Sequence, residues 1–210
     1  MNFKRRLQNP VGTRDPTKCA GGFAITSQSN QEGGGMSKTA AEREARGCAG
    51  EFRVASELCR RKMFAALTMG NIPNVDVLCS SSNANAAICI QVKTFRAHEK
   101  TCIVGENAEI DYGENFMWIL AGLRDEEHDS CEESFYIIPS DVMATNVTKL
   151  HKKWAATRGV KGNVHDKKCR IRNVRFGSVG KNDKFMFDVS SYKDRWDLIE
   201  EALRKASKSK

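Results

Sequence analysis

The sequence predicts an α/β fold in which a central mixed β-sheet is flanked by helices. Three features support this fold: an amphipathic helical pattern over residues 37–62, strand-like apolar runs between residues 64 and 138, and two further helical patterns after residue 139. The chain has 210 residues, of which 40% are hydrophobic, and this is enough for one sizeable core. We therefore expect one domain over residues 37–210.

The amino-terminal segment has a different composition. Residues 1–35 are rich in Gly, Ser, Asn, Gln and Thr and show no apolar periodicity. Segment 1–36 is therefore predicted to be a disordered tail. The codons for Gln31-Glu32-Gly33 can form a purine-rich tract that resembles a bacterial ribosome-binding site, a short spacer before the codon of Met36. One hypothesis is that Met36 is the native start, and the alternative is an ordinary flexible tail.

The first predicted helix can be capped by Ser37 or Thr39 and then carries apolar residues at helical spacing. Because Gly47 and Gly50 fall inside it, the pattern fits either one helix or two helices with a break. Strands are predicted over residues 64–68, 75–80, 87–95, 116–123 and 135–138.

The predicted strands differ in pattern. A polar turn separates 75–80 from 87–95, which predicts a hairpin, and 116–123 is apolar throughout, which predicts a buried central strand. The polar stretch 98–115 is predicted to be a loop. A helix then begins at Pro139-Ser140-Asp141, residues 161–184 are basic and irregular, and a terminal helix over 190–206 is expected to bury Trp196, Ile199 and Leu203.

Charge and cysteine usage limit the class of protein. A formal net charge of +8 and a pI of about 9.1 suit a polyanionic partner without requiring one. The apolar stretches are shorter than the ~20 residues of a membrane span, and no signal-peptide pattern is found. The eight cysteines are scattered without CxxC pairs, which favours a reduced, cytoplasmic protein. The four histidines show no metal-ligand spacing and receive no role.

Polar side chains interrupt the second strand of the predicted hairpin. Because side chains alternate along a strand, Gln91 and Lys93 share one face of 87–95, and the partner strand can place Asp76 beside them. Buried charges need partners, so the arrangement indicates either a structural ion pair or a site for metal and phosphate.

A carboxylate on the first helix points to the same place. Glu51 shares a helix face with Val54 and Leu58, which should meet the sheet. A carboxylate on this face needs a partner near the sheet. The alternative is that Glu51 lies at the edge of the face and pairs with Arg53 or with solvent.

Three motifs together resemble the restriction-endonuclease-like (PD-(D/E)XK) nuclease superfamily. They cover the stretch 50–94: Gly50-Glu51-Phe52-Arg53-Val54-Ala55-Ser56-Glu57-Leu58, then Asn74-Val75-Asp76-Val77-Leu78, then Ile90-Gln91-Val92-Lys93-Thr94. The variant with glutamine in the third motif is similar to Holliday-junction resolvases and group I intron homing endonucleases. The resemblance implies a restriction-endonuclease-like fold and metal-dependent hydrolysis of DNA phosphodiester bonds.

The resemblance also implies roles for single residues. Asp76 would be the bridging ligand of Mg²⁺ or Mn²⁺, Gln91 and the Val92 carbonyl would complete the protein ligands, and Glu51 would bind or orient the metal through water. Lys93 would position the attacking water and stabilise the pentacovalent phosphate.

Two departures from the family pattern affect these expectations. Val75 stands where the signature has proline, a position without chemistry. Gln91 replaces an acid and removes one negative charge, which predicts weaker metal binding. A noncatalytic nucleic-acid-binding relative, or a protein-interaction domain in which Asp76 and Lys93 form a structural pair, therefore remains an alternative.

The densest basic stretch lies near the carboxyl end. It is predicted either to follow a DNA backbone or to be a solvated loop or edge strand. Enzymes of this kind often act as dimers, so the resemblance also suggests a homodimer. The candidate nucleic-acid-binding residues are Lys161, Lys167, Lys168, Arg170, Arg172 and Arg175.

Overall fold

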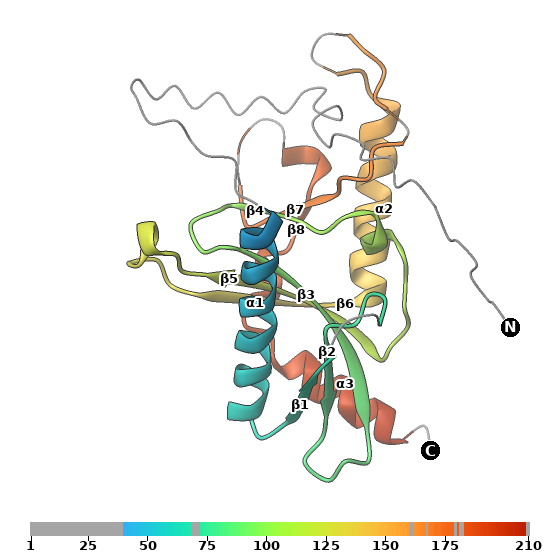
Figure 1. Cartoon of the computed structure of the whole chain (residues 1–210). Helices are drawn as coiled ribbons and strands as arrows, with labels where there is room; N and C mark the ends of the chain where they lie inside the picture. The colour runs from blue at the N-terminus through green and yellow to red at the C-terminus, as the bar shows by residue number, and fades with distance from the viewer. Residues whose placement is uncertain are drawn as a thin grey trace, which may run out of the picture.

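A computed structural model describes residues 40–68, 72–159, 162–166, 168–178, 180 and 183–208 (Figure 1). The predicted tail over 1–36, including Met36, lies outside the described residues. The described chain forms a mixed β-sheet with helices on both faces, which confirms the predicted fold class.

The main sheet has five strands in the order β1-β2-β3-β5-β6. The predicted hairpin is confirmed, because β2 and β3 pair antiparallel with Val77 opposite Ile90. β5 lies between β3 and β6, parallel to β3 and antiparallel to β6, and its side chains are almost all buried as predicted. The strands are β1 (Phe64–Leu67), β2 (Val77–Ser80), β3 (Ala87–Arg96), β5 (Phe116–Leu123) and β6 (Ser134–Pro139).

Helices α1 (Ala40–Arg60) and α3 (Asp197–Lys208) pack on one face of this sheet, and α2 (Ser140–Ala156) packs on the other. The first core joins Leu58 and Ile199 to the strands, and the second joins Met143 to Trp118 and its neighbours. The alternation of β3 serves both cores: Ile88, Ile90 and Val92 enter the first, whereas Phe95 enters the second.

Helix α1 is continuous through both glycines. At Gly50 a β-carbon would lie 1.8 Å from Thr94 Oγ1, so glycine allows the helix to approach β3 closely. Glycine is thus required here by packing, and it does not break the helix. This close contact places the next residue, Glu51, near β3.

The structure differs from the predictions in the connecting segments. The predicted loop 98–115 contains β4 (Thr101–Ile103) and the 3₁₀ helix η2 (Glu106–Glu109). Strand β4 pairs with β7 (Asn173–Arg175) from the stretch predicted to be irregular, and β8 (Phe187–Asp188) completes a second, three-stranded sheet. Strands of two or three residues are too short to show a sequence period, which explains why they were missed.

The carboxyl-terminal helix begins later than predicted. Residues Ser190–Tyr192 form a 3₁₀ turn (η5), Asp194 has a positive φ of 53°, and α3 starts only at Asp197. The burial predicted for Trp196, Ile199 and Leu203 is confirmed. The remaining short helices are η3 (Glu126–His128) and η4 (Asp183–Phe185).

Two bulk properties can be read from the described residues. None of the described helices has the length and apolarity that a membrane crossing requires. The cysteines in the described part of the chain are free thiols, and burial raises the pKa of the Cys79 and Cys102 thiols to about 12.

Candidate active site

The regular pairing of β2 with β3 ends at Val77 and Ile90, and the side chain of Asp76 lies between the two chain segments beyond this point. We call this place, formed by Asp76, Gln91 and Val92, the fork. The Asp76 N–H still donates to the Ile90 carbonyl at 2.9 Å, as a ladder partner would. Two residues further along β3, the Val92 N–H donates instead to Asp76 Oδ2 at 2.7 Å. The carboxylate therefore takes the place of a backbone acceptor, which fixes its position between the two strands.

Gln91 lies against the same carboxylate. Its Nε2 donates to Asp76 Oδ2 and, at 3.3 Å, to the Val92 carbonyl oxygen. A carboxylate, an amide and a main-chain carbonyl thus meet at one point, with the amide buried. Rotation of the amide group exchanges its nitrogen for its oxygen, so Gln91 can either donate to this carboxylate or present an oxygen beside it.

Glu51 approaches the fork from α1. Burial raises the pKa of the Glu51 carboxyl, the negative charge of Asp76 raises it further, and Lys93 opposes both effects. Burial likewise raises the pKa of Asp76, against the hydrogen bonds from Val92 and Gln91 and the charge of Lys93. The structure therefore brings the sequence-predicted residues Glu51, Asp76, Gln91, Val92 and Lys93 into one electrostatic unit.

Arg53, the alternative partner expected for Glu51, pairs with other carboxylates. Arg53 donates to Glu57 at 2.7 Å and to Glu133 at 2.9 Å. Within the described part of the chain, Glu51 forms no ion pair with an arginine or lysine. Asp76 and Lys93 influence each other electrostatically but do not form an ion pair either. The site consequently keeps two carboxylates that are only partly neutralised.

A polar pocket of about 220 Å³ opens beside the fork. Gln91 and Lys93 line one side, and Trp118, which pairs with Gln91 across β3 and β5, lines it as well. The buried Trp118 Nε1 has no hydrogen-bond partner among the described residues. The opposite side comes from the β4–η2 segment and from Arg170.

Short polar contacts hold the opposite side of the pocket. Arg170 Nε donates to Glu106 at 2.7 Å, and Asn107 Nδ2 donates to Asn74 Oδ1 at 2.6 Å, close to the fork. No sequence pattern pointed to Glu106, Asn107 or Trp118, because the first two lie in a predicted loop and the third resembles an ordinary core residue. Long-range pairing, which no local pattern records, brings them to Gln91.

Glu109 anchors the same segment to α2. It accepts a hydrogen bond from Arg172 Nε at 2.6 Å and lies 2.9 Å from His151 Nδ1. Arg172 also donates to the carbonyls of Cys169 and Ile171, and only 8% of it is exposed. This arginine, expected to contact nucleic acid, is therefore engaged in holding loops together.

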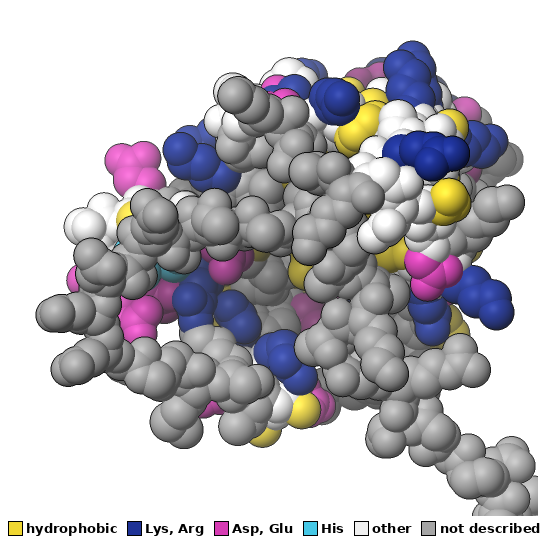
Figure 2. Space-filling model, turned by 90° about the horizontal axis from the view of Figure 1, so that it is seen from above, with side chains coloured by type: hydrophobic (Ala, Val, Ile, Leu, Met, Phe, Trp, Pro, Cys, Tyr) yellow, Lys and Arg dark blue, Asp and Glu magenta, His cyan; other side chains and the backbone are white. Residues whose placement is uncertain are grey.

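The other predicted nucleic-acid contacts differ in accessibility. Lys161 and Lys167 lie outside the described residues, and Lys168 is exposed. The Arg170 side chain is 79% exposed, whereas Arg175 is paired with Asp188 at 2.9 Å. Described basic side chains occur at several separate places on the face in Figure 2, with acidic side chains beside some of them.

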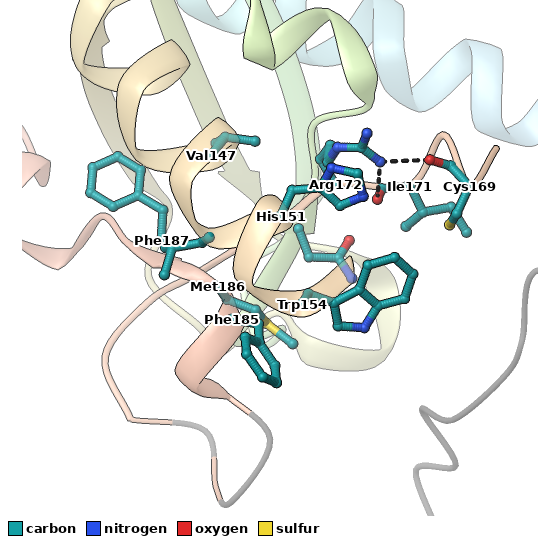
Figure 3. Close-up of a pocket in the computed structure, with 11 residues that line it drawn as sticks. Val147, His151, Trp154, Cys169, Ile171, Arg172, Phe185, Met186 and Phe187 are labelled. Carbon is teal, nitrogen blue, oxygen red and sulfur yellow. Dashed lines mark hydrogen bonds between the residues drawn. The ribbon is translucent and has the colours of Figure 1, made fainter. Parts of the chain in front are cut away.

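A second cavity of about 90 Å³ lies between α2 and the segments that carry Arg172 and Phe187 (Figure 3). Its lining is mainly apolar, with Trp154 and Met186 among the side chains that face it. Carboxylates are absent from its described lining. The groups that suit phosphodiester chemistry therefore lie at the fork.

The donor set at the fork fits a hard divalent cation. Mg²⁺ and Mn²⁺ prefer carboxylate, amide and carbonyl oxygens, which Asp76, Gln91 and Val92 provide within one hydrogen-bonded group. Burial raises the pKa values of both Glu51 and Asp76, and a bound cation would offset this effect.

Comparisons with known proteins give one neighbour to report. No family model matches the sequence, and no curated protein matches it. Among solved structures, a bacterial homing endonuclease aligns with a TM-score of 0.47 and 13% sequence identity, over 80% of this chain and 98% of that chain.

Proposed function

We propose that this protein is a metal-dependent endonuclease that hydrolyses DNA phosphodiester bonds at the fork between β2 and β3. The observation that carries the proposal is the pair of partly buried carboxylates, Glu51 and Asp76, beside Gln91 and Lys93. Two carboxylates that are only partly neutralised cost stability, which is expected where a cation and a phosphate are to be bound.

Asp76, the Val92 carbonyl and the Gln91 amide oxygen would hold Mg²⁺ or Mn²⁺, with Glu51 acting through water. A divalent ion held there would supply charge stabilisation to the phosphate and a more acidic bound water. This ligand set contains only one carboxylate in direct contact, so binding is expected to be weak and activity to need a high metal concentration.

Each group of the protein has a separate task in the proposed reaction. The Val92 N–H fixes the Asp76 carboxylate before any metal binds. Lys93 faces the pocket with Gln91, where its ammonium group would hold the attacking water or a phosphate oxygen. The unpartnered Trp118 Nε1 would donate a hydrogen bond within the same pocket.

DNA would approach over the open side of this pocket. Arg170 lines the pocket and is exposed, and Lys168 is exposed close to it in the chain, so these two residues are proposed to contact the backbone. Cleavage of both strands of a duplex would need two forks, which a homodimer would provide. The free cysteines fit the reduced environment of the cytoplasm.

The test is cleavage of labelled duplex, branched and single-stranded DNA with Mg²⁺ and with Mn²⁺. Wild type should cut at least one substrate only when metal is present, and Asp76→Ala and Lys93→Ala should not. Lys205→Ala is the matched control, because Lys205 pairs with Glu201 on α3, away from the fork. Cleavage that survives Asp76→Ala would contradict the proposal.

A second candidate function is nucleic-acid binding without cleavage. It is favoured by the contact of Gln91 Nε2 with Asp76, which satisfies the carboxylate without a metal. A protein-interaction domain with a structural Asp76–Lys93 pair has less support, because these side chains form no ion pair. Salt-dependent DNA binding with no cleavage at any metal concentration would select the second candidate.

A further inference from the structure

Parallel pairing of β3 and β5 brings two distant loops together. The carboxyl ends of parallel strands lie at the same edge of a sheet, and the Ala97 N–H donates to the Leu123 carbonyl at 2.8 Å just beyond the paired residues. The turn after β3 carries His98, and the connection after β5 carries Asp125 and His128. This edge lies on the order of 15 Å along β3 from Lys93.

The three side chains form a compact cluster. One ring nitrogen of each histidine and one carboxylate oxygen of Asp125 all lie within 4.8 Å of one another. His128 Nδ1 is 2.9 Å from Asp125 Oδ1, and the two imidazole rings stack with centroids 3.6 Å apart. The cluster is half-buried, so it has both a fixed scaffold and access to solvent.

The hydrogen-bonding needs of this cluster are not met by the described residues. His98 Nδ1 is buried and has no hydrogen-bond partner among them. Arg96 Nε lies 3.2 Å from Asp125 Oδ2 and supplies the local positive charge. A histidine–aspartate hydrogen bond explains His128, but it leaves the buried nitrogen of His98 without an acceptor or donor.

We propose that His98, Asp125 and His128 bind a late first-row divalent metal such as Zn²⁺. Two imidazoles and one carboxylate are a ligand set for this class of ion and not for Mg²⁺. A tetrahedral ion with bonds of about 2.0–2.1 Å needs ligand atoms about 3.3 Å apart, and the three ligand atoms already lie within 4.8 Å of one another. The two stacked imidazole rings would have to turn out of their stack so that both nitrogens point at the ion. The fourth position would be left to water.

The bound ion would join the end of β3 to the β5–β6 connection. This site is chemically distinct from the fork, where the ligands are hard oxygens. Arg96 would compete with the ion for Asp125, because both are cationic partners of one carboxylate. The Arg96→Ala variant should therefore bind Zn²⁺ more tightly than wild type, which a purely structural hydrogen-bond network would not predict.

The experiment titrates the full chain with Zn²⁺ by calorimetry and with Co²⁺ by visible absorption. Wild type should bind one equivalent at this site, and His98→Ala and His128→Ala should each lose about 100-fold or more in affinity, since even indirect partners of a ligand cost 10–100-fold. His165→Ala is the matched control, because His165 stacks on Trp154 at 4.0 Å and belongs to another cluster.

A parallel titration in the Asp76→Asn background separates this proposal from the nuclease. Zn²⁺ binding that persists there but disappears with His98→Ala places the ion at the histidine cluster whether or not DNA is cut. Circular dichroism of each variant confirms folding before titration. Equal Zn²⁺ affinity in wild type, His98→Ala and His128→Ala, or no binding by wild type, would overturn the proposal.

Discussion

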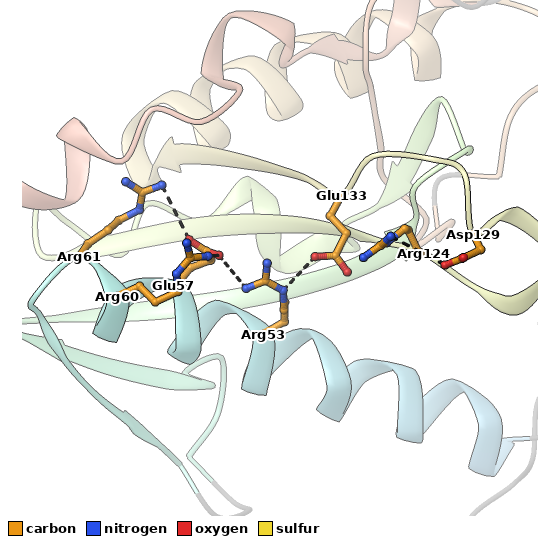
Figure 4. A network of polar contacts seen from close by, with 7 residues as sticks. All are labelled: Arg53, Glu57, Arg60, Arg61, Arg124, Asp129 and Glu133. Atoms are coloured by element: carbon orange, nitrogen blue, oxygen red, sulfur yellow. Dashed lines mark hydrogen bonds and ion pairs between the residues drawn. The ribbon is translucent and has the colours of Figure 1, made fainter.

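Glu51 and Glu57 lie on the same helix, less than two turns apart, yet their surroundings are opposite. Glu57 is buried and accepts contacts from Arg53 at 2.7 Å, Arg60 at 2.9 Å and Arg61 at 3.8 Å (Figure 4). These arginines outweigh its burial and lower its pKa. For Glu51, burial raises the pKa, and the negative charge of Asp76 raises it further.

The two glutamates differ in how far other side chains compensate their charge. The Glu57 network ties α1 to the rest of the domain, because Arg53 also bonds Glu133 and Arg61 lies 4.7 Å from the centre of the Trp196 ring. Burial of Glu57 is thus compensated within the fold. Burial of Glu51 is offset only in part, by the charge of Lys93, which agrees with the proposed role of Glu51 beside a cation.

The largest expected effect is on catalysis at the fork. Asp76→Asn keeps an acceptor for the Val92 N–H but removes the charge that would hold the metal. Metal-dependent cleavage should fall more than about 100-fold, while the unfolding free energy stays the same or rises. Initial rates on the best substrate of the panel, together with urea unfolding, measure both. If Asp76→Asn is unfolded, Asp76 is needed for the fold, and this result would contradict its assignment as a metal ligand that the fold does not need.

Gln91→Glu should strengthen Mg²⁺ binding at the fork. It restores a second carboxylate beside Asp76, so Mg²⁺ affinity should rise at least about tenfold, as expected from one added charge a few ångströms from a divalent ion. The Mg²⁺ concentration for half-maximal cleavage is the readout. Asn85→Asp is the control, because it adds the same charge at an exposed position in the turn at the other end of the β2–β3 pair. A lower or unchanged Mg²⁺ affinity would argue that Gln91 is a hydrogen-bond donor to Asp76 and not a ligand.

The two glutamates should respond differently to neutralisation. Glu57→Gln removes charge-assisted hydrogen bonds to Arg53, which is partly exposed, and to Arg60, which is exposed, and should lower the unfolding free energy by about 1 kcal/mol. Glu51→Gln should leave this free energy unchanged or raise it, because it removes an uncompensated charge. Urea unfolding at neutral pH measures both variants. A larger loss of unfolding free energy for Glu51→Gln than for Glu57→Gln would contradict the proposed difference between the two glutamates.

The pH dependence of stability provides the smallest and most specific effect. The pKa of Glu57 is lowered from 4.5, so the unfolded chain binds more protons here between the folded pKa and 4.5. Its stabilisation is therefore complete above pH 4.5 and is lost as the pH falls through the folded pKa. Wild type should lose stability on acidification more steeply than Glu57→Gln. Parallel acid limbs for the two proteins would show that Glu57 contributes nothing through its charge.

The sequence predicted the parts of the site that depend on local pattern. The hairpin and the alternation of β3 placed Gln91 and Lys93 on one face, and the helical period placed Glu51 toward the sheet. The electrostatic coupling of Glu51 to Asp76 agrees with that placement. The position of Asp76 beside Gln91 was also predicted, but the hydrogen bond from Gln91 Nε2 to Asp76 was not, because it depends on the exact point at which β2 and β3 stop pairing.

The features that the sequence could not reveal depend on distant pairing. His98 and His128 are far apart in the chain, and only the parallel pairing of β3 with β5 brings them together, so their spacing indicated no metal site. Arg172 looked like part of a basic stretch, but it lies directly before β7, which pairs with β4, and its buried side chain donates to Glu109. A sequence shows which residues are charged, but the fold determines which of them are exposed to solvent.

The most direct test of the account is Mg²⁺-dependent stabilisation of the wild-type protein, measured as the shift in unfolding temperature on titration with MgCl₂. Mg²⁺ is chosen because it does not favour imidazole ligands, so the histidine cluster should not contribute. We predict a saturable rise for wild type and for Glu57→Gln that is absent from Asp76→Asn. The same rise in all three proteins, or none in wild type, would contradict the claim that the fork is a metal site.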